Sequence, residues 1–300
     1  MSASPEAGFR SGFAALVGRP NVGKSTLLNA LIGQKLSIVT PRPQTTRHRI
    51  VGISHLPDAQ IALVDTPGLH DHGNRALNRV MNRTAATSLT DSDLVVLVIE
   101  ALKWTEGDEQ VLRRIARSGL PAIAAVNKVD RVRPKARLLP YLAELGARHA
   151  FAGVVPLSAL KDDNVAELRR VIAALLPVAP PMFAQDELTD RSLEFRIAEM
   201  IREKLTLELN QEVPYGVAVE VEQLRQESEQ LAVDAAIWVD REGQKPIVIG
   251  AQGERLKRVG RSARLALNAL LGRRLHLNLW VKVRENWADN ARALKQLGLE

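Results

Sequence analysis

The sequence predicts two domains: an α/β domain with a mostly parallel sheet, then a smaller α+β domain. Over residues 13–175, short apolar runs alternate with helix-like stretches, which is the pattern of a parallel sheet covered by helices. A proline-rich break, Leu176-Pro-Val-Ala-Pro-Pro-Met182, follows. Beyond the break the order changes to helix, strand, strand, helix, strand. We therefore expect domains at residues 1–177 and 191–300, joined by a linker at residues 178–190.

Each expected element follows from the spacing of its apolar residues. In the first domain we expect strands at residues 13–18, 61–64, 94–99, 122–126 and 154–157, and helices at residues 24–33, 75–88, 107–118, 134–147 and 163–175. In the second domain we expect helices at residues 191–210 and 252–271, strands at residues 215–223, 231–239 and 275–281, and a short last helix from Ala288. Ligands of open parallel sheets bind at the carboxyl ends of the strands, so motifs at those ends matter most.

Composition excludes several classes of protein. The 300 residues include no cysteine, which rules out a disulfide framework, a thiolate metal site and a cysteine nucleophile. No apolar run approaches the roughly 18 residues that a membrane-spanning helix needs. The first ten residues lack a basic segment followed by an apolar one, so we expect no secretory signal and a cytoplasmic location.

Charge is distributed unevenly along the chain. The net charge is +7, from 41 Lys and Arg against 34 Asp and Glu. Residues 185–240 hold 5 basic and 14 acidic residues, whereas residues 241–284 hold 11 basic and 2 acidic, a net of +9. Such a block could attract an anionic polymer, or it could be a solvated helix face with its counter-charges nearby. Aromatic residues make up only 4%, so base stacking should not dominate any nucleic-acid contact.

A phosphate-binding loop is predicted between the first strand and the first helix. Gly18-Arg-Pro-Asn-Val-Gly23-Lys24-Ser25 matches G-x-x-x-x-G-K-[ST], which occurs by chance in only ~1% of random chains of this length. The glycines allow successive N–H groups to point at a phosphate, and the helix N-terminus favours an anion. Lys24 can neutralise the β- and γ-phosphates, and the Ser25 hydroxyl can ligate Mg²⁺. The expected nucleotide contacts here are Gly18, Arg19, Pro20, Asn21, Val22, Gly23, Lys24, Ser25 and Thr26.

A second motif, Asp65-Thr66-Pro67-Gly68, follows the strand at residues 61–64. D-x-x-G alone is expected about once by chance in such a chain. At a strand end beside a phosphate loop, however, Asp65 can hold Mg²⁺ through water and the Gly68 N–H can contact the γ-phosphate.

A third motif, Asn127-Lys128-Val129-Asp130, follows the strand at residues 122–126. The Asp130 carboxylate can accept hydrogen bonds from N1–H and the exocyclic amine of guanine, a donor pair that adenine lacks. Asn127 can bond the purine N7 and tie this loop to the phosphate loop, and the stem of Lys128 can cover the base. After the next strand, Ser158-Ala159-Leu160 could offer an N–H to guanine O6. A solvated polar turn is the alternative reading of these segments.

In this order the motifs resemble those of the P-loop GTPases, which implies GTP and GDP as ligands and Mg²⁺-dependent hydrolysis. The resemblance makes residues 44–49 a switch region, in which a threonine ligates Mg²⁺ and reports the γ-phosphate. Thr45 and Thr46 are both candidates, and we favour Thr46 because related GTPases often carry a threonine just before an arginine. The implied metal ligands are Ser25, Thr46 and Asp65, and the implied catalytic residues are Lys24, Thr46 and Gly68.

One position departs from the best-known GTPases. Many place a glutamine directly after D-x-x-G to orient the attacking water, but this chain has Leu69 there. We therefore expect slow intrinsic turnover. Among GTPases with a hydrophobic residue at this place, the counterpart of Asn21 is a K⁺ ligand, so K⁺ is an optional cofactor. His70 and His72 are nearby candidates for a general base, although surface loop histidines are the simpler interpretation.

The second domain carries a G-x-x-G turn, Gly250-Ala251-Gln252-Gly253, which leads into a basic stretch. This turn, within the expected order of elements, resembles a type II-like KH module, in which the glycines admit a single-stranded RNA backbone. The implied RNA contacts are Gly250, Ala251, Gln252, Gly253, Arg255, Lys257, Arg258 and Arg261, although helical spacing prevents all four cations from facing one ligand. A glycine-rich turn that caps an ordinary helix is the alternative.

Taken together, the chain resembles the Era family of bacterial GTPases over essentially its full length. The segments that carry the resemblance are GRPNVGKST (18–26), QTTRHRIVGI (44–53), DTPGLH (65–70), NKVD (127–130), REGQKPIVIGAQG (241–253) and LWVKV (279–283). The resemblance implies a monomeric GTPase switch that binds the 3′ end of 16S ribosomal RNA in its GTP state and acts in assembly of the 30S subunit. Some family members also associate with the inner membrane surface. A passive RNA chaperone stays an alternative, while the single phosphate loop argues against a double-GTPase relative.

Overall fold

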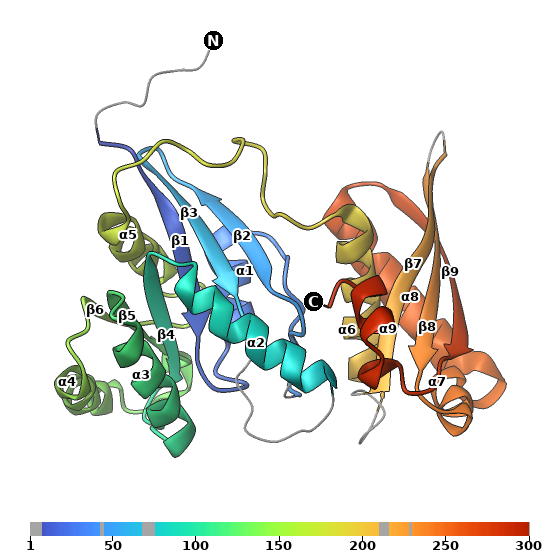
Figure 1. The fold of residues 1–300 in the computed structure, drawn as a ribbon, viewed down its shortest axis with the longest axis horizontal. Helices are drawn as coiled ribbons and strands as arrows, with labels where there is room; N and C mark the ends of the chain where they lie inside the picture. Colours follow the sequence, from blue (N-terminus) through green and yellow to red (C-terminus); the bar gives the residue numbers. More distant parts are fainter. Residues whose placement is uncertain (1–7, 43–44, 68–75, 210–215, 228–229, 300) are drawn as a thin grey trace, which may run out of the picture. The chain divides into compact units, whose positions relative to one another are not determined.

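A computed structural model describes residues 8–42, 45–67, 76–209, 216–227 and 230–299 (Figure 1). The chain divides into two compact units. Unit 1 comprises residues 1–37, 41–72 and 81–190, and unit 2 comprises residues 38–40, 73–80 and 191–300. Among the described residues, no helix combines the length and the apolar character that crossing a membrane requires.

Unit 1 is built on a six-stranded sheet of order β2-β3-β1-β4-β5-β6, in which only β2 runs antiparallel to its neighbour. The parallel strands read as nearly continuous apolar runs because both faces of the sheet are covered. This confirms the mostly parallel sheet that the sequence predicts. The strands are β1 (Arg10–Val17), β2 (Ile50–His55), β3 (Ala59–Asp65), β4 (Leu94–Glu100), β5 (Ala122–Asn127) and β6 (Gly153–Pro156).

Helices cover both faces of this sheet (Figure 1). On one face, α1 and α5 pack together and against β1 and β3. On the other, α3 buries Val111, Leu112 and Ile115 in an apolar cluster with residues of β4 and β5. This amphipathic spacing is what makes the segment a surface helix. The helices are α1 (Lys24–Ile32), α3 (Glu106–Ser118), α4 (Leu138–Arg148) and α5 (Val165–Leu175), together with residues 81–90 of α2 (Ala76–Thr90), whose first residues are assigned to unit 2.

The edge strand β2 is an element that our sequence analysis did not predict. Its residues are buried except for His55, with α1 packed against the strand and a later segment lying along it. The Ile53 N–H donates to Leu188 O at 2.9 Å, and the Thr189 hydroxyl donates to Val51 O at 2.7 Å. The C-terminal part of the segment at residues 178–190 therefore lies along an edge strand of unit 1.

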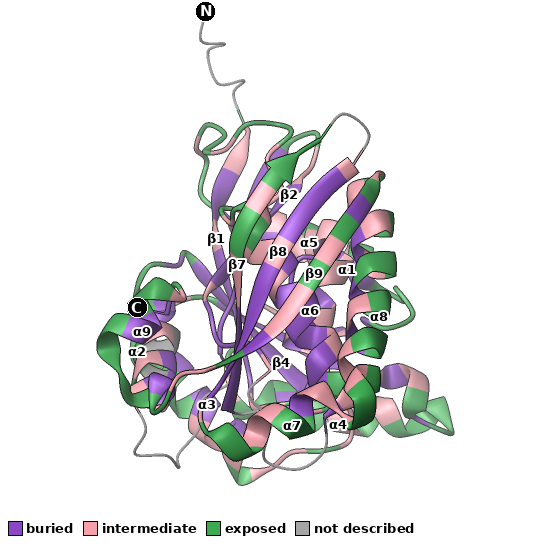
Figure 2. Cartoon of the chain, turned by 90° about the vertical axis from the view of Figure 1, so that its right-hand side faces the viewer, coloured by how far each residue is buried: buried purple, intermediate pink, exposed green. Residues whose placement is uncertain are grey.

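Unit 2 has a three-stranded sheet of order β7-β8-β9, with β7 antiparallel and β9 parallel to β8. Two helices, α6 and α8, contribute apolar residues to one core with β8, whose burial Figure 2 shows. This confirms the α+β prediction, while the five-residue α7 was not expected. The strands are β7 (Val217–Gln226), β8 (Gln230–Val239) and β9 (Arg274–Val283), and the helices are α6 (Leu193–Glu208), α7 (Lys245–Ile249), α8 (Glu254–Leu271) and α9 (Ala291–Gln296).

Candidate functional site

The loop from Gly18 to Lys24 connects the carboxyl end of β1 with the start of α1. Its backbone requires glycine at two positions. Gly18 has a φ of 154° and Gly23 a φ of 104°. A Cβ on Gly18 would lie 2.4 Å from Val98 O, and one on Gly23 would lie 2.3 Å from Asn127 Nδ2. The loop thus needs the two glycines that the motif specifies, and it ends at a helix N-terminus that favours an anion.

Lys24 is buried at the first position of α1. Its Nζ donates to two carbonyls of the loop, Gly18 O at 2.9 Å and Arg19 O at 3.2 Å. Burial lowers the pKa of Lys24 to about 8, although the nearby Asp65 carboxylate opposes this effect and Arg19 adds to it. An anion in the loop would supply the counter-charge that this buried ammonium needs.

The three predicted metal ligands come together around one carboxylate. Asp65 Oδ2 accepts a hydrogen bond from Ser25 Oγ at 2.8 Å, and Thr46 Oγ1 lies 3.5 Å away. The hydroxyls of Ser25 and Thr46 are themselves 2.8 Å apart. Of the two candidate threonines, Thr46 therefore reaches this cluster, whereas Thr45 Oγ1 donates to Arg42 O.

Ser37, which the sequence did not predict, is a fourth member of this cluster. Its fully buried hydroxyl donates to Asp65 Oδ2 at 2.9 Å. No motif marks Ser37, since it lies in a loop between α1 and β2. Only its position, close to the end of the first helix and before the switch region, could have drawn attention to it.

The chemistry of this cluster fits a hard cation such as Mg²⁺. Asp65 Oδ1 is buried and has no hydrogen-bond partner among the described residues. Burial raises the pKa of Asp65, while Lys24 and the surrounding hydroxyls hold it down. The described residues contain no group of three His, Cys, Asp or Glu that could enclose a metal by itself. One carboxylate and two hydroxyls instead suit an ion that takes its remaining oxygens from phosphates and water.

Asn127 joins three loops at the carboxyl end of the sheet. Its Nδ2 donates to Val22 O of the phosphate loop at 2.9 Å, and its Oδ1 accepts from Ala159 N at 3.0 Å. In the same region, Ser158 Oγ donates to Asp130 Oδ1 at 2.7 Å. The structure therefore brings the predicted base-recognition residues together and ties them to the phosphate loop. Leu160, the last of them, is exposed.

Two acidic residues that were not predicted support these loops. Glu100 Oε2 accepts from Lys128 Nζ at 2.9 Å and from Arg19 Nη2 at 3.4 Å, and the buried Asp108 accepts from Arg19 Nε at 3.1 Å. Burial alone would raise the pKa of Glu100, but the hydrogen bond and charge of Lys128, with Lys103 and Arg19, outweigh it and lower the pKa. Glu100 ends β4, so the strand-end rule could have identified it.

The rest of the D-x-x-G region is only partly described. The buried Thr66 donates through Oγ1 to Leu16 O at 3.1 Å, which fixes the end of β3 to β1. Pro67 is the last described residue here. Gly68, Leu69, His70 and His72 lie outside the described residues, as does Gln44.

In unit 2, the G-x-x-G turn links α7 to α8. Gly250 has a φ of 76° and Gly253, the N-cap of α8, a φ of 80°. A Cβ on Gly250 would lie 2.7 Å from Arg255 Cβ, so this turn also needs glycine. Gln252 adopts a positive φ of 50° between them.

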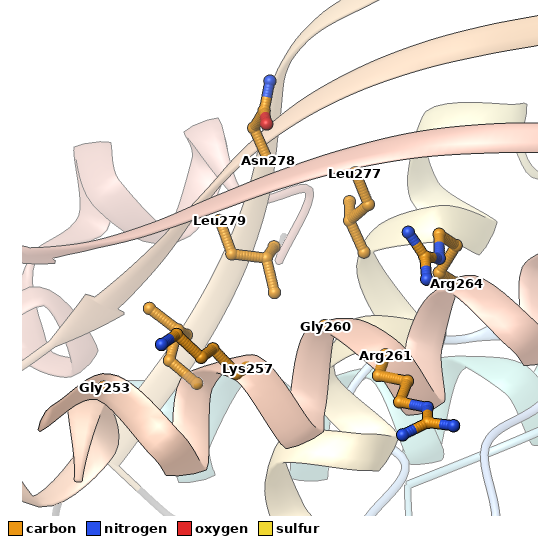
Figure 3. A pocket seen from close by; sticks show the side chains of 9 residues that line it. Gly253, Lys257, Gly260, Arg261, Arg264, Leu277, Asn278 and Leu279 are labelled. Atoms are coloured by element: carbon orange, nitrogen blue, oxygen red, sulfur yellow. The ribbon is translucent and has the colours of Figure 1, made fainter. Parts of the chain in front are cut away.

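A groove of about 500 Å³ opens between α8 and β9 (Figure 3). Leu277 and Leu279 point from β9 toward α8, while Asn278 points to the other side of the strand. Cations from α8 complete the lining. The lining residues are Gly253, Leu256, Lys257, Gly260, Arg261, Arg264, Leu277, Asn278 and Leu279.

The structure separates the four predicted RNA-contacting cations. Lys257 and Arg261 line the groove. Arg255 donates to Ile247 O, and Arg258 pairs with Glu208 of α6 at 3.2 Å. Arg264, which was not predicted, joins the groove because it lies one turn beyond Arg261.

A phosphate loop, a buried carboxylate–hydroxyl cluster and a base-recognition loop at one end of a parallel sheet, followed by a G-x-x-G groove, define a P-loop GTPase with a KH domain. The comparisons agree with this class. Residues 13–128 match the family described as 50S ribosome-binding GTPase, and residues 212–288 match the KH domain.

The chain belongs to the Era family of GTPases. It is 50% identical over 290 residues to GTPase Era of Marinobacter nauticus, a match that covers 97% of this chain and 95% of that protein. It is also 50% identical over 289 residues to GTPase Era of Stenotrophomonas maltophilia, covering 96% and 97% of the two chains.

Two solved structures extend the likeness to the whole fold. A variant of Aquifex aeolicus Era bound to GDP·AlF₄⁻ has a TM-score of 0.93 and 38% identity, covering 97% of this chain and 99% of that one. Era in complex with MgGDPNP and nucleotides 1506–1542 of 16S ribosomal RNA has a TM-score of 0.92 and 37% identity, with the same coverage.

Proposed function

We propose that this GTPase, in its GTP-bound state, binds the 3′ end of 16S ribosomal RNA in the groove between α8 and β9, and that GTP hydrolysis releases the RNA. The protein would act in assembly of the 30S subunit. The observation that carries the proposal is the basic groove beside the G-x-x-G turn, in a chain whose relative is known in complex with MgGDPNP and that RNA. Lys257, Arg261 and Arg264 are the cations placed to meet phosphates.

For the nucleotide, the backbone N–H groups of residues 18–26, other than Pro20, which has none, would hold the phosphates, with Lys24 as their counter-charge. Ser25, Thr46 and Asp65 would hold Mg²⁺, which neutralises charge between the β- and γ-phosphates when bound. Asp65 Oδ1, which is buried and has no hydrogen-bond partner among the described residues, supports this assignment. Asp130 would recognise guanine by hydrogen bonding, and Asn127, Lys128 and residues 158–160 would contact the base. Thr66, Pro67, Gly68 and Leu69 complete the proposed contacts.

Leu69 cannot orient the attacking water, so turnover by the protein alone should be slow. Asn21 is the proposed K⁺ ligand. Comparing phosphate release in K⁺ and Na⁺ tests the cation proposal, since equal rates would rule it out.

We further propose that the protein is a cytoplasmic monomer. Its net charge of +7 would favour peripheral attachment to an anionic membrane surface.

Binding titrations test guanine selection. We expect GTP and GDP to bind at least ~100-fold more tightly than ATP, because adenine would leave the Asp130 carboxylate unpaired. Asp130→Asn should remove most of this preference, and equal affinities of the unaltered protein for GTP and ATP would refute the assignment.

The RNA switch is tested with an oligonucleotide that corresponds to nucleotides 1506–1542 of 16S ribosomal RNA. Fluorescence anisotropy should show tighter binding with GDPNP than with GDP. A scrambled oligonucleotide of the same length is the control. Equal RNA affinity with GDPNP and GDP, or equal affinity for the two oligonucleotides, would contradict the proposal.

A further inference from the structure

Ser37 lies beside the metal carboxylate without belonging to any nucleotide-binding motif. Its side chain is completely buried, and its hydroxyl donates to Asp65 Oδ2 at 2.9 Å. Ser25 donates to the same oxygen, and Thr46 Oγ1 lies 3.5 Å from it. Three hydroxyls thus surround one carboxylate oxygen, while the other oxygen of Asp65 is left without a partner among the described residues.

The backbone of Ser37 is fixed to α1 by the side chain of Asn29. Asn29 Oδ1 accepts from the N–H groups of Leu36 and Ser37, each at 2.9 Å. Asn29 Nδ2 donates to Ser37 O at 2.8 Å. One side chain therefore makes three hydrogen bonds to two consecutive residues. Through Ser37, these hydrogen bonds connect the helix that begins at the phosphate loop with the carboxylate at the end of β3.

The three hydroxyls would have different partners once a metal binds. The proposed function assigns Ser25 and Thr46 to Mg²⁺, so their oxygens would turn their lone pairs to the ion. Ser37 is then the hydroxyl that stays with Asp65. A hydrogen bond to a charged acceptor is stronger than one between neutral groups, and partners of metal-binding groups orient those groups.

We propose that Ser37 is a positioning residue, which holds the Asp65 carboxylate in the orientation that Mg²⁺ requires, and that Asn29 holds Ser37 in place. This inference rests on the proposed metal site at Asp65. A purely structural Ser37, whose buried hydroxyl merely needs an acceptor, makes a different prediction. Its removal would reduce stability without a specific effect on Mg²⁺.

The test measures how the dissociation rate of a fluorescent GDP from the full-length protein depends on Mg²⁺ concentration. In Ser37→Ala we expect the Mg²⁺ midpoint to rise about 10-fold, the lower end of the range for partners of metal ligands. The dissociation rate in excess EDTA should stay within about twofold of the unaltered protein, because the phosphate and base contacts remain.

Ser54→Ala is the matched control. Ser54 is also a buried serine of unit 1, but its hydroxyl donates to Leu31 O at 3.1 Å and not to Asp65. It should leave the Mg²⁺ midpoint unchanged. Asn29→Ala keeps the Ser37 hydroxyl but removes the three hydrogen bonds that hold it, so it should raise the midpoint in the same direction but by less than Ser37→Ala does. This variant also provides the answer if Ser37→Ala does not fold.

Asp65→Asn distinguishes a failure of the metal site from a failure of the positioning role of Ser37. If Asp65→Asn raises the midpoint strongly while Ser37→Ala and Asn29→Ala do not, the positioning role is wrong and the metal site stands. If Asp65→Asn also leaves the midpoint unchanged, the proposed metal site itself fails. An equal shift in Ser37→Ala and Ser54→Ala would assign Ser37 to stability alone.

Discussion

The nucleotide loops and the groove between α8 and β9 differ in how their polar groups are satisfied. Around the nucleotide loops, Lys24, Asp65 and Asn127 are all buried, and each is hydrogen-bonded to a residue of the phosphate loop or of the start of α1. In the groove, Lys257 and Arg261 make no ion pair or hydrogen bond within the part of the chain that the structure describes. The first arrangement relies on buried, directional hydrogen bonds, and the second on exposed positive charge.

Glycine serves the two sites differently as well. At Gly18 and Gly23 an added Cβ would meet another atom at 2.4 and 2.3 Å. The two glycines that line the groove have more room: at Gly253 nothing lies within 4 Å, and at Gly260 the nearest atom is Leu279 Cδ1 at 3.5 Å. Only Gly250, at the start of the turn and outside the lining, is comparably crowded, with Arg255 Cβ at 2.7 Å. The nucleotide site should therefore fail abruptly when its shape changes, whereas the groove should weaken gradually and respond strongly to salt.

The largest effect should come from Gly23→Ala. The new Cβ would displace the Asn127 amide and strain a backbone with a φ of 104°. We expect a loss of at least ~100-fold in GTP affinity by calorimetry, because the phosphate loop and the base loop move together. Gly33→Ala is the control: Gly33 also has a positive φ, of 75°, but nothing within 4 Å. It should cost stability alone. GTP binding within fivefold of normal in Gly23→Ala would show that the nucleotide site tolerates a change of shape.

Next come Lys257→Gln and Arg261→Gln in the groove. Each should weaken RNA binding at low salt by about 5–10-fold and reduce the slope of log K against log salt by about 1. Anisotropy titrations between 50 and 200 mM salt (roughly the range over which phosphate contacts lose affinity) measure this. Arg258→Gln, whose guanidinium pairs with Glu208, should change the slope less. Equal slopes in all three variants would show that the groove does not select among these cations.

Glu100→Gln should have a smaller effect. Its carboxylate joins Lys128 of the base loop to Arg19 of the phosphate loop, but it is partly exposed. We expect GTP affinity to fall about 2–5-fold, the range of a partly screened ion pair. Glu144→Gln, which loses only a surface pair with Arg148, is the control. A 100-fold loss would mean that the nucleotide site depends on charge as strongly as on shape.

The sequence predicted those parts of the fold that depend on continuous apolar runs. The central parallel strands are almost entirely buried, so their composition alone distinguishes them. The edge strand β2 was missed because its burial depends on Leu188 and Thr189, more than 130 residues later. The helix α7 was missed because five residues are too few for a periodic pattern.

The same distinction applies to the sites. Lys24, Asp65 and Asn127 were found because their roles require fixed positions at strand ends or in a loop. Ser37 and Asp108 were not, since each reaches its partner only through tertiary packing. Spacing alone indicated that the four cations of α8 could not all face RNA, but which ones line the groove depends on where β9 and Glu208 lie.

The smallest effect should come from Gly260→Ala, which gives opposite signs for stability and binding. Alanine is a better helix former than glycine by about 0.5–1 kcal/mol, and the added methyl would only touch Leu279. Slower hydrogen exchange in α8 should report this gain, while RNA affinity should fall about twofold as the groove narrows, about 0.4 kcal/mol. Ala269→Gly, in the same helix and away from the groove lining, is the converse control and should speed exchange without altering RNA binding. If RNA affinity rose with helix stability in Gly260→Ala, the rigidity of α8, and not the width of the groove, would limit binding.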